Sequence, residues 1–428
     1  MTKKLNDREL LDLALKCNRC GTCQDVCPTY LITGRETDVA RSRIRLIRMV
    51  AEGKYAWGEE AELSEHLKSC LLCKACVTAC PSNVPTDEIM MHARNEINNV
   101  KGMPLFNRIA YRGIFSHSGR LALLARLLRL YQRSFASSLV RKSGFLNLLR
   151  NYGKAEALLP PIPEKSLKAR LPELIRTPPQ VKHTVVYFAG CAINAFYGRF
   201  GAATIEVLQH NHCRVHAPAV VCCGGPHLSG GDFEEARELA RNNIDTILHL
   251  QPDAVVSDCA TCSGIMKEYE KLFENDPDYL EKSRTFVAKI RDVSEFLLEI
   301  GIEKPSGTID ATVTVHDPCH LSRGQKLADA PRQLLAKIDG LKRVEMEDAE
   351  MCCGGAGSYG ALHPDASRQI LARKMTGYDQ SGAHYLATSC PACAMQLEFG
   401  LRHHSLEGSV VHPIELLAKA YTHIPEAS

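Results

Sequence analysis

The sequence predicts an α+β and α/β protein, in which an N-terminal, mainly helical domain precedes two copies of an α/β domain. Three observations lead to this prediction: two cysteine tetrads of equal spacing before residue 100, a proline-rich stretch over residues 160–179, and a cysteine pattern that recurs after it. A chain of 428 residues exceeds one hydrophobic core, so about three domains are expected. We expect them at residues 1–100, 181–305 and 306–428, with a basic helical segment and a stiff proline-rich linker at 101–180.

Both tetrads have the spacing Cys-x-x-Cys-x-x-Cys-x-x-x-Cys-Pro, the bacterial ferredoxin pattern for a [4Fe–4S] cluster. Three thiolates on a short loop surround one face of a cubane cluster, and the fourth cysteine ligates the cluster of the other tetrad. Zinc knuckles and a disulfide framework are the alternatives, which are disfavoured because zinc sites separate paired Cys-x-x-Cys units by a long gap. We therefore predict two cubane clusters, one on Cys17, Cys20, Cys23 and Cys80, and the other on Cys70, Cys73, Cys76 and Cys27.

The composition is that of an ordinary soluble protein, with 45% hydrophobic residues and a net charge of +3. The N-terminus shows no apolar segment typical of a signal peptide, and no apolar run approaches the roughly twenty residues of a membrane helix. In a reducing compartment, nineteen cysteines indicate metal binding rather than disulfides. We expect a cytoplasmic protein.

Residues 97–155 are strongly basic, with eleven Lys or Arg and no Asp or Glu. The stretch 109–149 is also apolar in a helical rhythm, which predicts basic amphipathic helix. Residues 101–155 then either contact an anionic surface, such as the inner face of the cell membrane or an acidic partner subunit, or pack across the chain's own domains. Nucleic-acid binding is not expected, because no recognised motif or interleaved aromatic residues accompany the charge.

After residue 180, each repeat supplies a single cysteine, a Cys-Cys-Gly-Gly and a Cys-x-x-Cys, about 130 residues from its counterpart. Short β-rich runs at 184–188, 254–257, 311–316 and 384–388 each end just before a cysteine. Open α/β sheets bind ligands at the carboxyl ends of their strands, so we expect the cysteines to gather there. The five cysteines of the first repeat are Cys191, Cys222, Cys223, Cys259 and Cys262, and those of the second are Cys319, Cys352, Cys353, Cys390 and Cys393.

These ten cysteines and the eight of the tetrads leave only Cys213, which we interpret as a small buried residue at the start of a strand. Five thiolates exceed the four of a structural zinc site and suit a larger or irregular iron–sulfur core. Four glycines beside the cysteine pairs would let the backbone approach sulfur and donate N–H bonds to it, with plain turn geometry as the alternative. They are Gly224, Gly225, Gly354 and Gly355.

The repeated pattern resembles the cysteine-rich CCG domain of heterodisulfide reductase subunits B and D. The same tandem follows a two-cluster ferredoxin domain in the iron–sulfur subunits of glycolate oxidase and anaerobic glycerol-3-phosphate dehydrogenase, and the resemblance covers nearly the whole chain. In the reductases a complete five-cysteine set holds a non-cubane [4Fe–4S] cluster. The resemblance thus implies up to two non-cubane clusters here, one on each of the two five-cysteine sets.

The chain shows no flavin or nicotinamide fingerprint, so two-electron chemistry is expected on a partner. The first hypothesis is the electron-transfer subunit of a flavin-linked 2-hydroxyacid dehydrogenase complex of the glycolate or D-lactate type. An FAD-containing partner would supply electrons that leave to a quinone, a cytochrome or another carrier. The second is a heterodisulfide-reductase-like catalyst, and the third treats the repeats as zinc-bearing docking modules on a ferredoxin.

Two histidines near the repeat cysteines are candidates for proton transfer. His316 and His320 flank Cys319, and His320 is the predicted proton donor if a disulfide or a quinone is reduced at this site. A packing histidine is the alternative interpretation. His227, shortly after the first cysteine pair, suggests the same role with less support.

Overall fold

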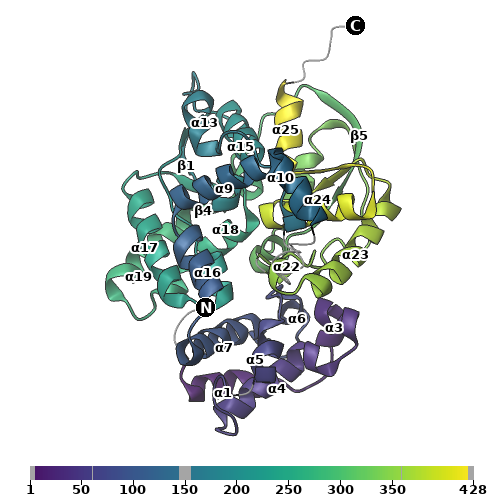
Figure 1. The fold of residues 1–428 in the computed structure, drawn as a ribbon. Coiled ribbons are helices and arrows are strands. Elements are labelled where there is room, and N and C mark those ends of the chain that lie inside the picture. The colour runs from purple at the N-terminus through teal and green to yellow at the C-terminus, as the bar shows by residue number, and fades with distance from the viewer. Residues whose placement is uncertain (1–4, 60, 144–155, 358, 423–428) are drawn as a thin grey trace.

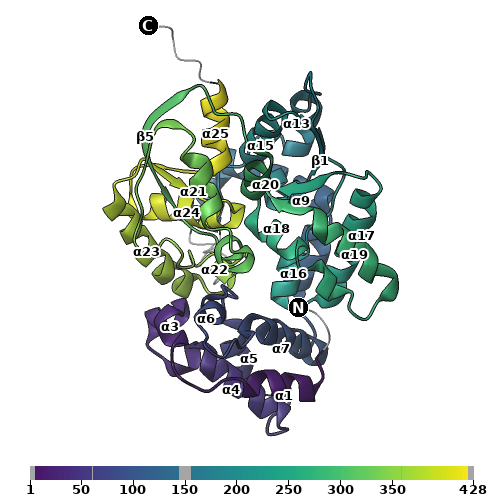
Figure 2. The same ribbon diagram turned by 180° about the vertical axis from the view of Figure 1, so that it is seen from behind.

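The computed structural model describes residues 5–59, 61–143, 156–357 and 359–422. A helical N-terminal domain lies against two α/β units that stand side by side (Figure 1). The view from behind shows the same three parts, with the N-terminal domain in contact with both α/β units (Figure 2). The predicted fold class is confirmed.

The N-terminal domain is built from short helices around a small apolar core. On the helix α4, Ile44 and Ile47 face this core at helical spacing. Arg43 on the same helix is also buried and donates hydrogen bonds to the His66 carbonyl and to two hydroxyls. The elements are α1 (Asp7–Leu15), α2 (Cys23–Val26), α3 (Pro28–Thr33), η1 (Glu36–Asp38), α4 (Ala40–Ala51), α5 (Ala61–Lys68), α6 (Ala75–Thr78) and α7 (Thr86–Lys101).

The basic segment is helical, but in separate pieces: α8 (Leu105–Arg108), η2 (Ile109–Phe115), α9 (Ser118–Arg133) and α10 (Phe135–Lys142). Part of it packs on the chain itself, since Tyr111 and Leu121 are buried and Arg112 forms a bidentate ion pair with Asp232 at 2.7 and 2.8 Å. The remainder of the predicted 109–149 stretch, from residue 144, lies outside the described residues. No described helix is both long enough and apolar enough to cross a bilayer.

The proline-rich stretch is not the bare stiff linker that its composition predicts. After η3 (Glu156–Leu158), it contains the helix α13 (Leu167–Leu174), which begins with the fully buried Leu167. Leu167 contacts the first α/β unit so closely that a Cβ on Gly201 would lie 2.3 Å from its Cδ2. The extended part before α13 is also held, because the Gln132 side chain bonds both the Pro160 carbonyl and the Ile162 N–H. The burial of Leu167 therefore holds this proline-rich stretch against the first α/β unit, so the stretch does not act as an extended linker.

Each α/β unit contains one four-stranded parallel sheet. The first sheet has the order β2-β1-β3-β4, from β1 (His183–Tyr187), β2 (Cys213–His216), β3 (Ala254–Ser257) and β4 (Ile290–Asp292). The second has the equivalent order β6-β5-β7-β8, from β5 (Thr308–Val315), β6 (Asp339–Arg343), β7 (Tyr385–Ala387) and β8 (Ser409–Val411). Cys213 is fully buried at the first position of β2, as expected.

Helices cover both faces of these sheets, which explains why the inner strands are buried at their carboxyl ends. The first unit has α14 (Cys191–Ala195), α15 (Gly198–His210), α16 (Gly225–Gly230), α17 (Phe233–Leu248), α18 (Ala260–Met266), η4 (Tyr269–Leu272), α19 (Pro277–Lys289) and α20 (Val293–Ile300). The second unit has η5 (His320–Gly324), α21 (Asp329–Leu335), α22 (Tyr359–Leu362), α23 (Pro364–Ser381), α24 (Pro391–His404) and α25 (Pro413–Thr422).

The two α/β units share one continuous hydrophobic core. Arg199 reaches across from the first unit to Glu398 and Glu415 of the second, at 3.0 and 2.8 Å. At the centre of the junction, the Ala260 N–H donates to the Ser389 carbonyl at 2.8 Å. This bond joins the Cys-x-x-Cys segments of the two repeats.

Candidate metal centres

The cysteines of the two N-terminal tetrads line two cavities. One cavity is lined by Cys70, Cys73 and Cys76 together with Cys27 of the other tetrad. The second is lined by Cys17, Cys20, Cys23 and Cys80, with Cys76 at its edge. The fold thus brings each fourth cysteine beside the other tetrad, as the exchange of ligands between two ferredoxin clusters requires.

The two cysteine loops have the same backbone conformation. Arg19 and Gly21 in the first loop have positive φ angles of 59° and 92°, and Leu72 and Lys74 have 54° and 59° at the matching positions of the second. Successive N–H groups in such turns point inwards and favour a bound anion, which suits an anionic cluster. Left-handed backbone costs a non-glycine residue about 1–2 kcal/mol. Lys74 is held in this conformation by ion pairs with Asp87 and Glu268 at 3.1 and 3.2 Å.

Nearly all repeat cysteines meet at one cavity of about 180 Å³, between the two α/β units and the N-terminal domain. It is lined by Cys191, Cys223, Cys259, Cys262, Cys319, Cys352, Cys353, Cys390 and Cys393. The tenth, Cys222, is buried and lines a smaller cavity together with Cys191. The structure therefore brings together the five cysteines of each repeat and places the two sets beside one another.

The Cys-x-x-Cys segment of each repeat begins a helix. Cys259 is the N-cap of α18, and its Sγ accepts the Cys262 N–H at 3.4 Å. Cys390 is the N-cap of α24. Their thiols are neighbours across the junction between the repeats, where Thr261 Oγ1 lies 3.4 Å from Cys390 Sγ. The two helix N-termini favour thiolate at this point, because each presents free N–H groups and the positive end of a dipole.

At the glycines after the cysteine pairs, the structure shows both left-handed turn geometry and close approach of the backbone to sulfur. Gly224 and Gly354 adopt φ of 83° and 84°, so each turn requires a residue without a Cβ. The Gly354 N–H also donates to Cys352 Sγ at 3.5 Å. A Cβ on Gly225 or Gly355 would lie 3.5 Å from the preceding Sγ, which shows how closely the backbone passes the sulfurs.

The second repeat packs against the second N-terminal tetrad through apolar side chains and a hydrogen bond. Leu71, Cys73 and Ala75 pack against Met351 and Cys352. Arg323, which follows Cys319 on η5, donates to the Cys73 carbonyl at 3.4 Å. Burial raises the pKa of the Cys73 thiol to about 11 and that of Cys319 above its usual range. These thiols are protonated at neutral pH without metal, so metal binding must release protons.

His320 and His227 lie beside the repeat cysteines in different settings. His320 lines the shared cavity, with its Nδ1 3.6 Å from Cys319 Sγ, and burial lowers its pKa. Its role as a proton donor stays a prediction. His227 is fully buried, and its Nε2 lies 3.1 Å from Ser116 Oγ and 3.2 Å from the Tyr111 carbonyl. These bonds to the basic segment indicate a packing role for His227.

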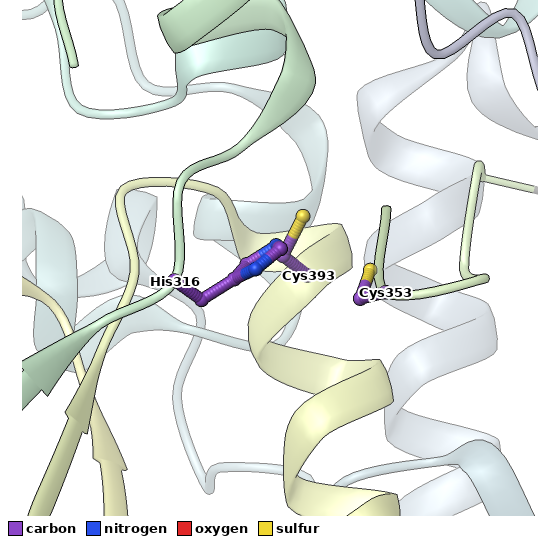
Figure 3. A group of neighbouring side chains, drawn as sticks. All are labelled: His316, Cys353 and Cys393. Atoms are coloured by element: carbon purple, nitrogen blue, oxygen red, sulfur yellow. The ribbon is translucent and has the colours of Figure 1, made fainter. Parts of the chain in front are cut away.

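One residue to which the sequence assigned no role lies beside two cysteines of the second repeat. His316 is buried with Cys353 and Cys393, and one ligand atom of each lies within 4.8 Å of the others (Figure 3). The signal in the sequence is a difference between the repeats, because the first has Phe188 three residues before its single cysteine, where the second has His316.

Comparison with known proteins agrees with this organisation. Residues 13–84 match the family described as "4Fe-4S dicluster domain", and residues 185–267 and 313–398 each match "Cysteine-rich domain", or CCG. Residues 103–159 match "Glycolate oxidase iron-sulfur subunit, linker region". The fold and the cysteine sets define an iron–sulfur protein in which a dicluster ferredoxin domain is joined to two CCG domains.

The similarity to whole proteins is more specific. The chain is 34% identical to the "Probable glycolate oxidase iron-sulfur subunit" of Bacillus subtilis, over 98% of this chain and 96% of that protein. It is 30% identical to the "Glycolate oxidase iron-sulfur subunit" of Escherichia coli, over 94% and 93%. "Lactate utilization protein A" of Macrococcus caseolyticus is 32% identical over 54% of this chain and 95% of that protein. The chain belongs to the family of glycolate oxidase iron–sulfur subunits.

Proposed function

We propose that this protein is the electron-transfer subunit of a flavin-linked 2-hydroxyacid dehydrogenase complex of the glycolate or D-lactate type. The observation that carries the proposal is the similarity to glycolate oxidase iron–sulfur subunits along almost the entire chain. Oxidation of a 2-hydroxy acid to a 2-oxo acid releases two electrons and two protons. An FAD-containing partner subunit accepts the electron pair, and this chain passes the electrons singly to a quinone, a cytochrome or another carrier.

The cysteine sets form a sequence of neighbouring sites for this transfer. The N-terminal domain holds two cubane clusters, on Cys17, Cys20, Cys23 and Cys80 and on Cys70, Cys73, Cys76 and Cys27, and the two cavities support this pairing. Each repeat holds a non-cubane cluster on its five cysteines. The contact of Cys73 with the second repeat supports a route from the second N-terminal cluster into the second repeat.

A heterodisulfide-reductase-like activity is not favoured. The two relatives that match the chain over nearly its full length have names that refer to glycolate oxidase. The linker match points the same way, because residues 103–159 lie outside both kinds of cysteine-rich domain and still match a segment of glycolate oxidase iron-sulfur subunits.

The test is the composition of the anaerobically purified complex. Iron, acid-labile sulfide, zinc and flavin are measured per chain, together with oxidation of glycolate and D-lactate. About sixteen iron, with flavin on a co-purifying subunit and 2-hydroxyacid oxidation, supports the proposal. About eight iron with zinc overturns the assignment of the repeats, and the absence of a flavoprotein partner overturns the proposed complex.

The basic segment provides a membrane contact for this complex. Of the described residues, the large apolar side chains that are exposed concentrate here, including Leu127, Leu130 and Phe135 at 55, 66 and 83% exposure. Apolar side chains among arginines fit an anionic lipid surface at the inner face of the cell membrane. Replacing Leu127 and Leu130 by Gln should reduce binding to vesicles of anionic lipid, whereas Leu15→Gln, at a 50% exposed site on α1, should not. Equal binding of the two variants to the vesicles would exclude the basic segment as the membrane contact.

A further inference from the structure

The two repeats differ at one equivalent position inside their metal sites. Phe188 and His316 each follow the last residue of a strand, β1 and β5, and each lies three residues before the single cysteine. The Phe188 N–H donates to the Val256 carbonyl at 2.8 Å, and the His316 N–H donates to the Ala387 carbonyl at 2.9 Å. Both side chains are buried, with 0 and 1% exposure. The equivalent backbone positions therefore carry an apolar ring in the first repeat and an imidazole in the second.

The His316 ring lacks the partners that a packing histidine has. Both ring nitrogens are inaccessible to water, and in the described part of the chain neither has a nitrogen or oxygen partner. His412, which is equally buried, bonds through both nitrogens, to the Asp258 carbonyl at 3.0 Å and to the Ile414 N–H at 3.1 Å. A buried polar group left without a partner costs about 1–3 kcal/mol. The ring lies instead beside the Cys353 and Cys393 sulfurs.

We propose that His316 binds the metal of the second repeat directly through a ring nitrogen, beside Cys353 and Cys393. The second site then has a mixed cysteine and histidine donor set, while the first site is bound by cysteine alone. Imidazole is a good ligand for iron, and a neutral ring beside thiolates makes the site less anionic. Histidine in place of cysteine raises the reduction potential of other iron–sulfur centres. The second site, which contacts the N-terminal clusters, is therefore the stronger electron acceptor of the two repeats.

This inference rests on the proposed function, which places iron in both repeats, so the experiment separates the two. The full chain is purified anaerobically with its partner and with [¹⁵N]histidine, and the paramagnetic signal of the second site is identified by its loss in Cys353→Ser. Electron–nuclear spectroscopy of that signal should show a directly bound nitrogen that changes with ¹⁵N. The nitrogen should disappear in His316→Phe, which copies the first repeat, and persist in His227→Gln, a buried histidine near the first site.

A second variant distinguishes loss of the nitrogen ligand from loss of the fold. His316→Cys supplies a thiolate in place of the imidazole, and it should retain iron, lose the nitrogen coupling and lower the midpoint potential of this site alone. The N-terminal cluster signals report that each variant is folded. The inference is overturned if the second site holds iron without a histidine nitrogen, or if the nitrogen coupling survives in His316→Phe. Either result leaves the proposed function intact. Iron content that is unchanged in Cys353→Ser overturns the cluster assignment itself.

Discussion

Arg94 on α7 ties the second cysteine loop to the first repeat, and its removal should destabilise the protein and that loop together. Its guanidinium donates to the Cys70 carbonyl at 2.6 Å and to the Lys68 and Leu67 carbonyls at 3.0 and 3.2 Å. Its other terminal nitrogen donates to the Ser229 carbonyl on α16 at 2.7 Å. Arg94→Met keeps most of the apolar stem and leaves these four carbonyl groups without their donor.

The expected loss follows from the chemistry of these contacts. A hydrogen bond to a charged group contributes about 1.5–3 kcal/mol, but several bonds from one group are not additive. A buried acceptor left without its donor costs about 1–3 kcal/mol, and four partly buried carbonyl groups lose their donor together here. We therefore expect Arg94→Met to lower the free energy of unfolding by about 3–5 kcal/mol. Arg94→Lys has one compact donor group, and its free energy of unfolding should lie between those of Arg94→Met and the wild type.

Urea unfolding of the anaerobic holoprotein measures this effect, with circular dichroism and cluster absorbance as two probes. The exposed Arg45 on α4 provides the matched control, because Arg45→Met should leave the midpoint unchanged. The cluster absorbance of Arg94→Met should be lost at lower urea than the helical signal of the repeats. A decrease below about 1 kcal/mol, or equal effects in Arg94→Met and Arg45→Met, would refute the reasoning.

Three further predictions test the sites and the fold. Cys27→Ser should remove the cluster of the other tetrad, so that about four iron are lost while the Cys17 cluster persists, and Cys80→Ser should do the reverse; iron analysis with electron paramagnetic resonance checks both. Gly190→Ala places a Cβ 2.9 Å from Cys262 Sγ and should lower the iron content of the first repeat alone, as measured by Mössbauer spectroscopy. Burial raises the pKa of Asp292 from 3.8 to about 7, so the folded state binds more protons than the unfolded state between these values, and stability falls as pH rises through this window. Asp292→Asn keeps an acceptor for the Ser294 N–H and should stabilise the protein at pH 8 relative to pH 5 by at most about 3 kcal/mol; an unchanged pH dependence of the urea midpoint would contradict this.

Features that depend on local spacing could be predicted from the sequence. The tetrads, the repeated cysteine pattern and the strands before each cysteine are short-range patterns, and the structure places β3 at the expected residues 254–257. The helix α17 is likewise specified locally, because the Asp232 side chain caps its start by accepting the Glu235 N–H. Local chemistry determines these elements, since apolar periodicity and turn residues are sufficient to specify them.

Features that depend on contacts between distant segments could not be predicted. The burial of Arg43 requires the His66 carbonyl, which lies 23 residues away, and no pattern within α4 indicates it. The α13 helix forms across Pro172 because Leu167 finds a buried place in the first repeat. His316 could be recognised only by aligning the two repeats with the sheets in view, since its neighbours Cys353 and Cys393 lie 37 and 77 residues further along the chain.

The hydrogen bond from the Ala260 N–H to the Ser389 carbonyl joins the two repeats at their metal sites, so the burial of each site depends on the other repeat. Cys259 and Cys390 are 4 and 2% exposed, and they touch each other at the junction, so each repeat buries part of the other's site. A lone repeat would open its Cys-x-x-Cys helix start to water and oxygen. Any relative with a single such repeat must obtain this cover from a second polypeptide. Duplication within one chain made the pairing permanent, and it freed the two halves to diverge in sequence without losing each other.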